Sequence, residues 1–169
     1  MSEGVLMVRP AVAADAEPIA TLHAASIREL ASDAYDPAVI EAWASGKDPG
    51  EYPVDESGHH LIVAEVDGTL AGFGELVVEA DDYLEAEVAG EIRAVYVDPA
   101  FAREGVGQRL YEDLEAAARE RGLDSVGLWA SLNAVPFYEA QGFERVASVT
   151  HEFGGDVPGP AVEMRKRLD

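Results

Sequence analysis

Residues 91–122 constrain the fold of this chain more than any other part of the sequence. Glu91–Val97 is largely apolar and β-branched and ends at Asp98-Pro99, which predicts a strand followed by a turn. Apolar residues then recur at helical spacing through Gly105–Arg121, and Gly122 stands where a helix often ends in glycine. A strand, a turn and an amphipathic helix in this order predict an α/β domain.

The rest of the chain supplies further elements by the same signals. Strands are expected at Val5–Arg9, Leu61–Val66, Leu70–Val78, Ser125–Ala130, Phe143–Phe153 and Ala161–Arg167. Helices are expected at Asp15–Ala31, with Asp15 as a candidate N-cap, at Pro37–Ser45 and at Ala134–Gln141. Asp67-Gly68 predicts a hairpin turn, Gly46–Gly58 a loop, and Asp81–Gly90 begins as a loop. This order predicts a single domain over residues 1–169 with a mixed sheet.

The chain is strongly acidic. Its 33 Asp and Glu residues against 12 Lys and Arg give a formal net charge of −21. Such a surface repels nucleic acids and anionic membranes, so neither is expected as a partner. We interpret the acid excess as adaptation to a high-salt cytoplasm, because salt of about 1 M shortens the Debye length to about 3 Å and screens the repulsion. An ordinary acidic protein is the alternative.

Residue types that are missing exclude several kinds of site. The chain contains no cysteine, which excludes disulfides, thiol nucleophiles and thiolate metal sites. His23 and His151 show no metal-ligand spacing, and no metal is expected. No segment approaches the roughly 20 apolar residues that a membrane-spanning helix needs. Because Met1–Arg9 lacks the features of a secretion signal, we expect a cytoplasmic location.

The turn before the long helix is the first candidate site. The start of a helix leaves about four peptide N–H groups without intrahelical partners and carries partial positive charge. Gly105 and Gly107 let this backbone approach a ligand closely, so the residues Arg103–Gln108 could cradle a pyrophosphate. A helix that merely begins with glycines is the alternative. Two common phosphate loops are excluded, because no Gly-Lys-Ser/Thr follows and Leu110 occupies the position of a third glycine.

A second candidate site follows the strand Ser125–Ala130. Ser131 and Asn133 form a polar pair at the end of this strand, and Tyr138 lies in the next short helix. Taken alone, such a tyrosine is more often a core residue whose hydroxyl is hydrogen-bonded. Together with the glycine turn upstream, it becomes a candidate for catalysis.

The two motifs resemble those of the GNAT superfamily of N-acetyltransferases. Val97-Asp98-Pro99 is similar to a Val-x-Pro strand ending, and the run from Ala102 to Gly107 is similar to the turn Gln/Arg-x-x-Gly-x-Gly/Ala. The run from Ser131 to Phe143 is similar to Asn-x-x-Ala-x-x-Phe-Tyr-x-x-x-Gly-Phe. Ala102 departs from the first motif, with Arg103 one place later. Ser131 occupies the Asn position of the second, and Asn133 follows two places on.

The resemblance implies an α/β GNAT fold, with a central mixed and mostly antiparallel sheet, flanked by helices, whose splayed strands form an acyl-CoA cleft. Acetyl-CoA would lie between the strand ending at Val97 and the strand Ser125–Ala130, with the backbone of Val95 and Val97 beside the pantetheine arm. The other cofactor-binding residues that the resemblance implies are Tyr96, Arg103, Glu104, Gly105, Val106, Gly107, Gln108, Ser131 and Asn133.

The resemblance also implies direct attack of an amine on the thioester, without a covalent enzyme intermediate. An amine with a pKa near 10.4 must lose a proton, and the leaving thiolate benefits from gaining one. Tyr138 matches the family's proton donor to the thiolate. Glu91 matches the catalytic base of some members, whereas others use chains of water molecules. Lesser candidates for the base are Glu75, Asp98 and the pair His59-His60.

The acceptor is expected to be a primary amine on a small molecule or a protein, bound by the helices Asp15–Ser45 and the loops Gly46–Gly58 and Glu79–Gly90. Trp43 and Tyr52 could line its pocket, with core packing as the alternative role of Trp43. The resemblance also makes a homodimer through edge strands an expectation. Two other functions stay open: an acyl-CoA-binding sensor or partner module without turnover, and a nucleotide-binding protein unrelated to CoA.

Overall fold

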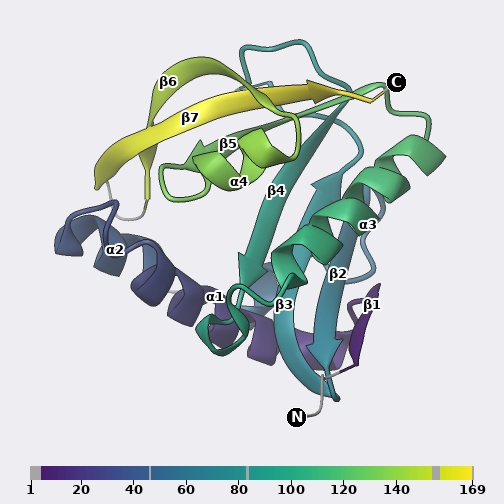
Figure 1. Cartoon of the computed structure of the whole chain (residues 1–169), viewed down its shortest axis with the longest axis vertical. Coiled ribbons are helices and arrows are strands. Elements are labelled where there is room, and N and C mark those ends of the chain that lie inside the picture. Colours follow the sequence, from purple (N-terminus) through teal and green to yellow (C-terminus); the bar gives the residue numbers. More distant parts are fainter. Residues whose placement is uncertain (1–4, 46, 83, 154–156, 169) are drawn as a thin grey trace.

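A computed structural model describes residues 5–45, 47–82, 84–153 and 157–168. The predicted loop boundary at Gly46 lies outside the described residues. The strands are β1 (Leu6–Pro10), β2 (His59–Val66), β3 (Thr69–Val77), β4 (Gly90–Val97), β5 (Ser125–Ser131), β6 (Glu144–Glu152) and β7 (Pro158–Arg167). The helices are α1 (Ala16–Leu30), α2 (Pro37–Ala44), α3 (Val106–Glu120) and α4 (Val135–Ala140) (Figure 1). These bounds confirm the predicted elements to within a few residues.

The strands form one sheet in the order β1-β2-β3-β4-β5-β7-β6. All neighbours pair antiparallel except β4 and β5, which are parallel, so the predicted mixed and mostly antiparallel sheet is confirmed. The parallel pairing joins only Gly90 to Val126 and Glu91 to Gly127. Beyond these pairs the two strands diverge into a V-shaped opening, which Figure 1 shows between β4 and β5. The predicted splayed strands are therefore present.

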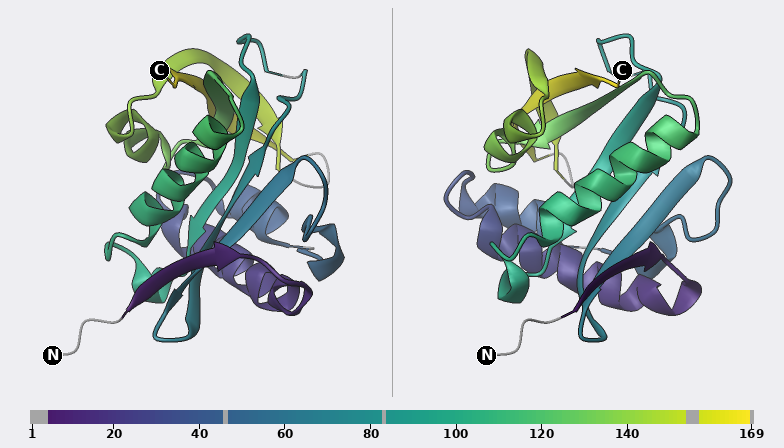
Figure 2. Two further views of the ribbon diagram at one scale, coloured as in Figure 1. Left: turned by 90° about the vertical axis from the view of Figure 1, so that its right-hand side faces the viewer. Right: turned by 45° about the vertical axis from the view of Figure 1, so that its right-hand side comes forward.

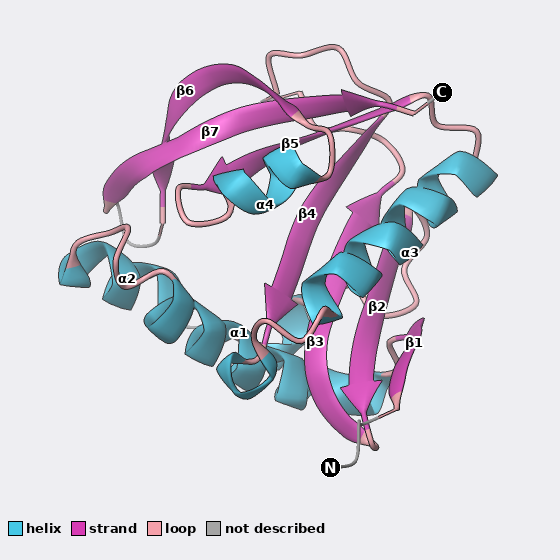
Figure 3. Ribbon diagram, viewed as in Figure 1, coloured by secondary structure: helices cyan, strands magenta, loops and turns pink. Residues whose placement is uncertain are grey.

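Helices cover both faces of the sheet. Helices α3 and α4 lie on one face, and α1 and α2 lie on the other (Figures 2 and 3). The predicted apolar stripe of α3 is buried, and Leu110 and Leu114 are fully inaccessible to solvent. Gly72 of β3 permits the close approach of α3, since a Cβ atom there would lie 2.9 Å from Leu110 Cδ1. Helix α3 thereby packs closely against β3, the strand beside β4.

Local sequence signals account for the hairpin between β2 and β3 and for the end of α3, but not for the start of α1. Asp67 and Gly68 both have positive φ, 51° and 82°, which is the backbone of a type I′ hairpin turn. Gly122 ends α3 with a φ of 75°. The candidate cap Asp15 makes no side-chain cap hydrogen bond to α1. Its carboxylate instead accepts hydrogen bonds from the Arg9 guanidinium and from the Val12 N–H, because an arginine on β1 lies within reach.

Candidate functional site

The backbone of β4 presents peptide groups to the opening beside β5. The Asp98 N–H donates to the Ala71 carbonyl at 2.8 Å, on the β3 side of the strand. Because hydrogen-bonding groups alternate between the two edges of a strand, the groups of Val97 and Val95 point to the other side. That side faces the opening, since β5 has already diverged. The backbone position predicted for Val95 and Val97 thus suits pairing with an extended ligand.

The turn before α3 places a row of peptide N–H groups at the open end of this gap. Gly105 precedes the first helical residue with a φ of 84°, and Arg103 also has a positive φ of 65°. Within the described part of the chain, the peptide N–H groups of residues 103–108 make no hydrogen bond of good geometry. Unpartnered N–H groups at a helix start attract anions. This turn therefore fits a phosphate-bearing ligand.

A cavity of about 180 Å³ connects the helix start with the diverging strands. Its lining includes the predicted site residues Val95, Tyr96, Val97, Gly107, Ser131, Asn133 and Tyr138. The side chain of Val106 is instead buried in the core, and Gln108 binds Glu112 and Gln141. Arg103 and Glu104 are exposed on the turn. Val106 and Gln108 can therefore contribute to the site mainly through their backbone.

Tyr138, the predicted proton donor, lines the first cavity. It extends from α4, is 7% exposed, and packs edge-on against the rings of Phe137 and Phe143. Burial raises the pKa of Tyr138, and the nearby Tyr96 hydroxyl adds to the shift. The phenol consequently stays protonated at neutral pH and can donate its proton or a hydrogen bond.

Glu91 stands where the parallel pairing of β4 and β5 ends, and it is 1% exposed. Its Oε1 atom lies 3.5 Å from Arg93 Nε and accepts a long hydrogen bond, 3.4 Å, from the Asp81 N–H. Burial raises the pKa of Glu91, although Arg93 and the Asp81 N–H oppose the shift. A carboxylate with a raised pKa is a better proton acceptor near neutral pH.

Glu91 lines a second cavity, of about 480 Å³, rather than the one that Tyr138 lines. The two cavities adjoin, because six residues line both: Trp43, Ile92, Arg93, Tyr96, Trp129 and Ser131. The structure thus brings the two predicted catalytic residues to neighbouring spaces. Trp43 is buried in the core, which confirms its predicted packing role, and it also lines both cavities.

The lesser candidates lie away from these two cavities. Glu75 is bound to His59 at 2.8 Å between β2 and β3, and His59 is half-buried. Asp98 accepts from the Ala100 N–H and caps a short turn. Tyr52 lies against His23, with its hydroxyl 3.0 Å from Nδ1. None of them lines either cavity.

Sequence reasoning missed part of the second cavity. Arg93 is the extra residue of a β-bulge, between the pairs that Ala94 and Ile92 make with β3. The cavity is also lined by Trp129 on β5, by His151 on β6 and by Phe153, which directly follows β6. No local pattern joins residues so far apart, and only the sheet order brings them together. A bulge is similarly invisible without the partner strand.

The described residues contain no group of acidic or histidine side chains that could hold a metal ion. None of the described helices is long and apolar enough to cross a membrane. The arrangement suits an elongated ligand with its anionic part at the start of α3 and its reacting end near the junction of the two cavities.

Known proteins share the fold of this chain and part of its sequence. The GCN5-related N-acetyltransferase structure from Rhodopseudomonas palustris superposes with a TM-score of 0.83 and 28% identity over 99% of both chains. PaiA N-acetyltransferase from Thermoplasma acidophilum, solved with coenzyme A, gives a TM-score of 0.73 at 20% identity, covering 96% of this chain and 99% of that one.

An uncharacterized N-acetyltransferase of Methanocaldococcus jannaschii is 33% identical over 93 residues, which is 53% of this chain and 40% of that protein. The chain spans about half the length of the curated relatives it matches. Residues 19–143 match the model of the acetyltransferase (GNAT) family. With most of its length matched and its fold shared, the chain belongs to the GNAT family of acetyltransferases.

Proposed function

We propose that this protein transfers the acetyl group of acetyl-CoA to a primary amine by direct attack in a ternary complex. The observation that carries the proposal is the line formed by the start of α3, the free backbone edge of β4 and the cavity beside Tyr138. Proteins of similar fold were solved with coenzyme A and, in yncA from Salmonella typhimurium, with acetyl-CoA. The same three features here offer a place for diphosphate, pantetheine and thioester in turn.

The peptide N–H groups of residues 103–108 would hold the diphosphate, and the backbone of Val95 and Val97 would pair with the pantetheine amides. Ser131 and Asn133 both line the first cavity, so either side chain can reach the same arm. In a chain with a net charge of −21, unpartnered N–H groups provide a local positive field for an anion.

The reaction requires three proton transfers. The bound ammonium first loses a proton to solvent through Glu91 and water, which leaves a neutral amine. The amine nitrogen then bonds to the acetyl carbon and gives its second proton to the Glu91 carboxylate, directly or through water. The carbon–sulfur bond then breaks, and the thiolate gains the Tyr138 proton. Exchange with solvent afterwards restores the Glu91 carboxylate and the Tyr138 phenol. The raised pKa of Glu91 and the buried, protonated state of Tyr138 support these assignments.

Incubation of the purified protein with acetyl-CoA and primary amines tests the proposal, with thiol release and the mass of the N-acetylated product as readouts. Transfer to an amine that depends on the protein would support the enzyme. Binding of acetyl-CoA without turnover of any amine would identify a sensor or partner module instead. Thermal stabilisation by ATP or NAD but not by CoA would indicate an unrelated nucleotide-binding protein.

A further inference from the structure

The second cavity carries information about the acceptor. We infer that it binds an arylalkyl monoamine, which is a primary amine joined by a short alkyl chain to an aromatic ring. Such an amine is bound in preference to an amino acid, a polyamine or an amino sugar. The inference rests on the proposed function, because it names the substrate class of the same site. Three features of the cavity support the inference: its aromatic walls, its charged groups and the buried hydrogen bonds that hold the walls in place.

The walls of the cavity are mainly aromatic rings from four parts of the chain. Phe153 lies 4.9 Å from Trp43 and 4.7 Å from His151, measured between ring centroids. Trp129 continues the wall at 5.7 Å from His151, and Tyr96 lies 6.5 Å from Trp43. Aromatic faces offer a large apolar contact area and also attract ammonium groups. These walls suit an apolar body that carries a cationic amine.

The charged groups of the cavity favour a cation and disfavour a carboxylate. Among the described lining residues, Glu91 is the acid and Arg93 the strong base. Arg93 Nη2 lies 3.1 Å from Asp81 Oδ2, and Arg93 Nε lies 3.5 Å from Glu91 Oε1. The Arg93 guanidinium thus pairs with both the Asp81 and the Glu91 carboxylates. These three groups carry a net charge of −1 when both acids are ionised. The carboxylate of an amino acid would have to compete with both of them.

Other classes of amine lack partners here. A polyamine needs a second acid for its distal ammonium, and the described lining residues supply Glu91 alone. An amino sugar needs donors and acceptors for several hydroxyls, whereas the uncharged side chains among the described lining residues that can accept a hydrogen bond are those of Ser131, His151 and Tyr96. Unpartnered buried hydroxyls are costly. The volume of about 480 Å³ lies in the range of small-molecule sites.

Two buried polar contacts hold the aromatic walls in place. Trp129 Nε1 donates to Glu163 Oε1 at 3.1 Å, and Glu163 is 0% exposed. Tyr35 packs between Trp43 and Phe153, and its hydroxyl donates to the Pro160 carbonyl at 2.6 Å. Walls fixed in this way are preformed, which reduces the entropic cost of binding a rigid ring.

The test compares one arylalkyl amine with representatives of the other amine classes and with a neutral isostere. 2-Phenylethylamine is titrated into the CoA-loaded protein and, separately, into the protein without CoA. The same titrations are carried out with L-phenylalanine, spermidine, glucosamine and the neutral isostere 2-phenylethanol. With acetyl-CoA the same amines are compared by kcat/KM. We expect 2-phenylethylamine to exceed each other amine about tenfold in both affinity and kcat/KM.

Variants separate the charge from the walls. Glu91→Gln should weaken 2-phenylethylamine binding about tenfold and change 2-phenylethanol binding by no more than about twofold. Phe153→Leu should weaken both ligands. The exposed acid Glu139, replaced in Glu139→Gln, serves as the matched control and should leave both affinities unchanged.

Preference for spermidine, glucosamine or L-phenylalanine would overturn the inference while the acetyltransferase proposal stands. The inference would also be overturned if 2-phenylethylamine bound neither the CoA-loaded protein nor the protein without CoA. Absence of CoA binding is a separate result, which would contradict the proposed function, and the titration without CoA would still decide the acceptor class.

Discussion

Tyr138 offers the simplest separation of chemistry from binding. Its ring packs between Phe137 and Phe143, whereas its hydroxyl is the group proposed to protonate the thiolate. Tyr138→Phe keeps the packing and removes the donor. We expect kcat to fall about a hundredfold, because general acid catalysis contributes on the order of 10²–10⁴. Calorimetry should show an unchanged CoA affinity, and full activity in the variant would remove Tyr138 from the mechanism.

Glu91 should control activity at acidic pH. Since burial raises the pKa of Glu91 above its ordinary value, the carboxylate accepts a proton and loses its role as base as the pH falls through that raised value. We therefore predict that kcat/KM declines on the acidic side and that Glu91→Gln removes this limb of the profile.

Other titratable groups face the same cavity and need a control. Arg93 and Asp81 flank Glu91, and His151 lines the wall with a pKa lowered by burial. A His151→Gln variant keeps Glu91 and should keep the acidic limb. If the limb disappears in His151→Gln and persists in Glu91→Gln, then the imidazole is the base and the assignment of Glu91 is wrong.

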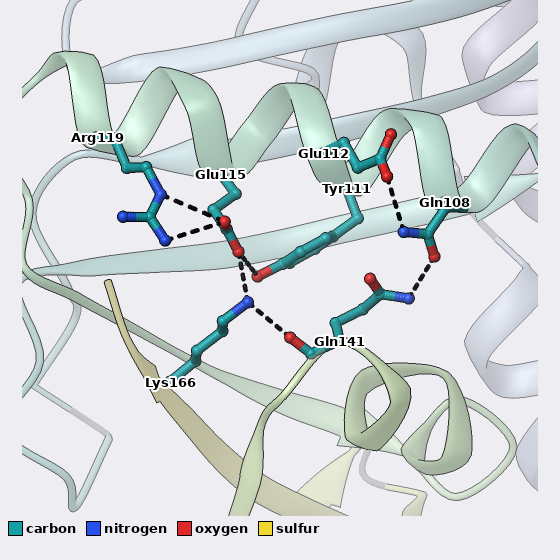
Figure 4. Close-up of polar contacts among 7 residues, drawn as sticks. All are labelled: Gln108, Tyr111, Glu112, Glu115, Arg119, Gln141 and Lys166. Carbon is teal, nitrogen blue, oxygen red and sulfur yellow. Dashed lines mark hydrogen bonds and ion pairs between the residues drawn. The ribbon is translucent and has the colours of Figure 1, made fainter. Parts of the chain in front are cut away.

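At the scale of elements, a polar network fastens α3 to α4 and β7 (Figure 4). Lys166 Nζ lies 2.6 Å from both Glu115 Oε1 and the Gln141 carbonyl oxygen. The Tyr111 hydroxyl donates to the same Glu115 oxygen at 2.7 Å. Although burial opposes the shift, the hydrogen bonds from Lys166 and Tyr111 lower the pKa of Glu115. The network thus spans the face that carries both candidate motifs.

Lys166→Met should therefore destabilise the protein by about 1–3 kcal/mol, because it leaves a largely buried carboxylate and a helix-end carbonyl short of a donor. Urea unfolding measures the change. The matched control is Arg145→Met, which breaks an exposed ion pair with Glu139 and should cost about 0–1 kcal/mol. Equal losses in the two variants would show that the network contributes no more than a surface pair.

Elements with strong local signals were predictable from the sequence. The stripe of α3, its terminal Gly122 and the Asp67-Gly68 hairpin follow from local spacing and backbone preference. The divergence of β4 and β5 does not, because it depends on where pairing between distant segments stops. That feature was expected only through the family resemblance.

Contacts between distant segments explain what the sequence could not predict. Tyr35 accepts a hydrogen bond from the Leu132 N–H at 2.9 Å, across 97 residues of sequence. The aromatic walls of the second cavity likewise combine Trp43 with Trp129 and Phe153. Each of these residues alone matches an ordinary core aromatic, so their joint role appears only in the folded chain.

The net charge of −21 acts on the whole molecule. Because about 1 M salt shortens the Debye length from about 10 Å to about 3 Å, KCl should weaken repulsion among surface carboxylates. We predict that the urea midpoint of unfolding rises as KCl increases from about 0.1 M to about 2 M. A midpoint that stays constant or falls would favour an ordinary acidic protein over one adapted to high salt.

The central claim is that the peptide N–H groups before and at the start of α3 bind the diphosphate of CoA. Calorimetry with CoA and with pantetheine, which lacks the diphosphate and the nucleotide, tests this claim directly when it is carried out in concentrated KCl. The account predicts that CoA binds at least about a hundredfold more tightly than pantetheine. Equal affinity for the two ligands, or no affinity for CoA, would contradict it.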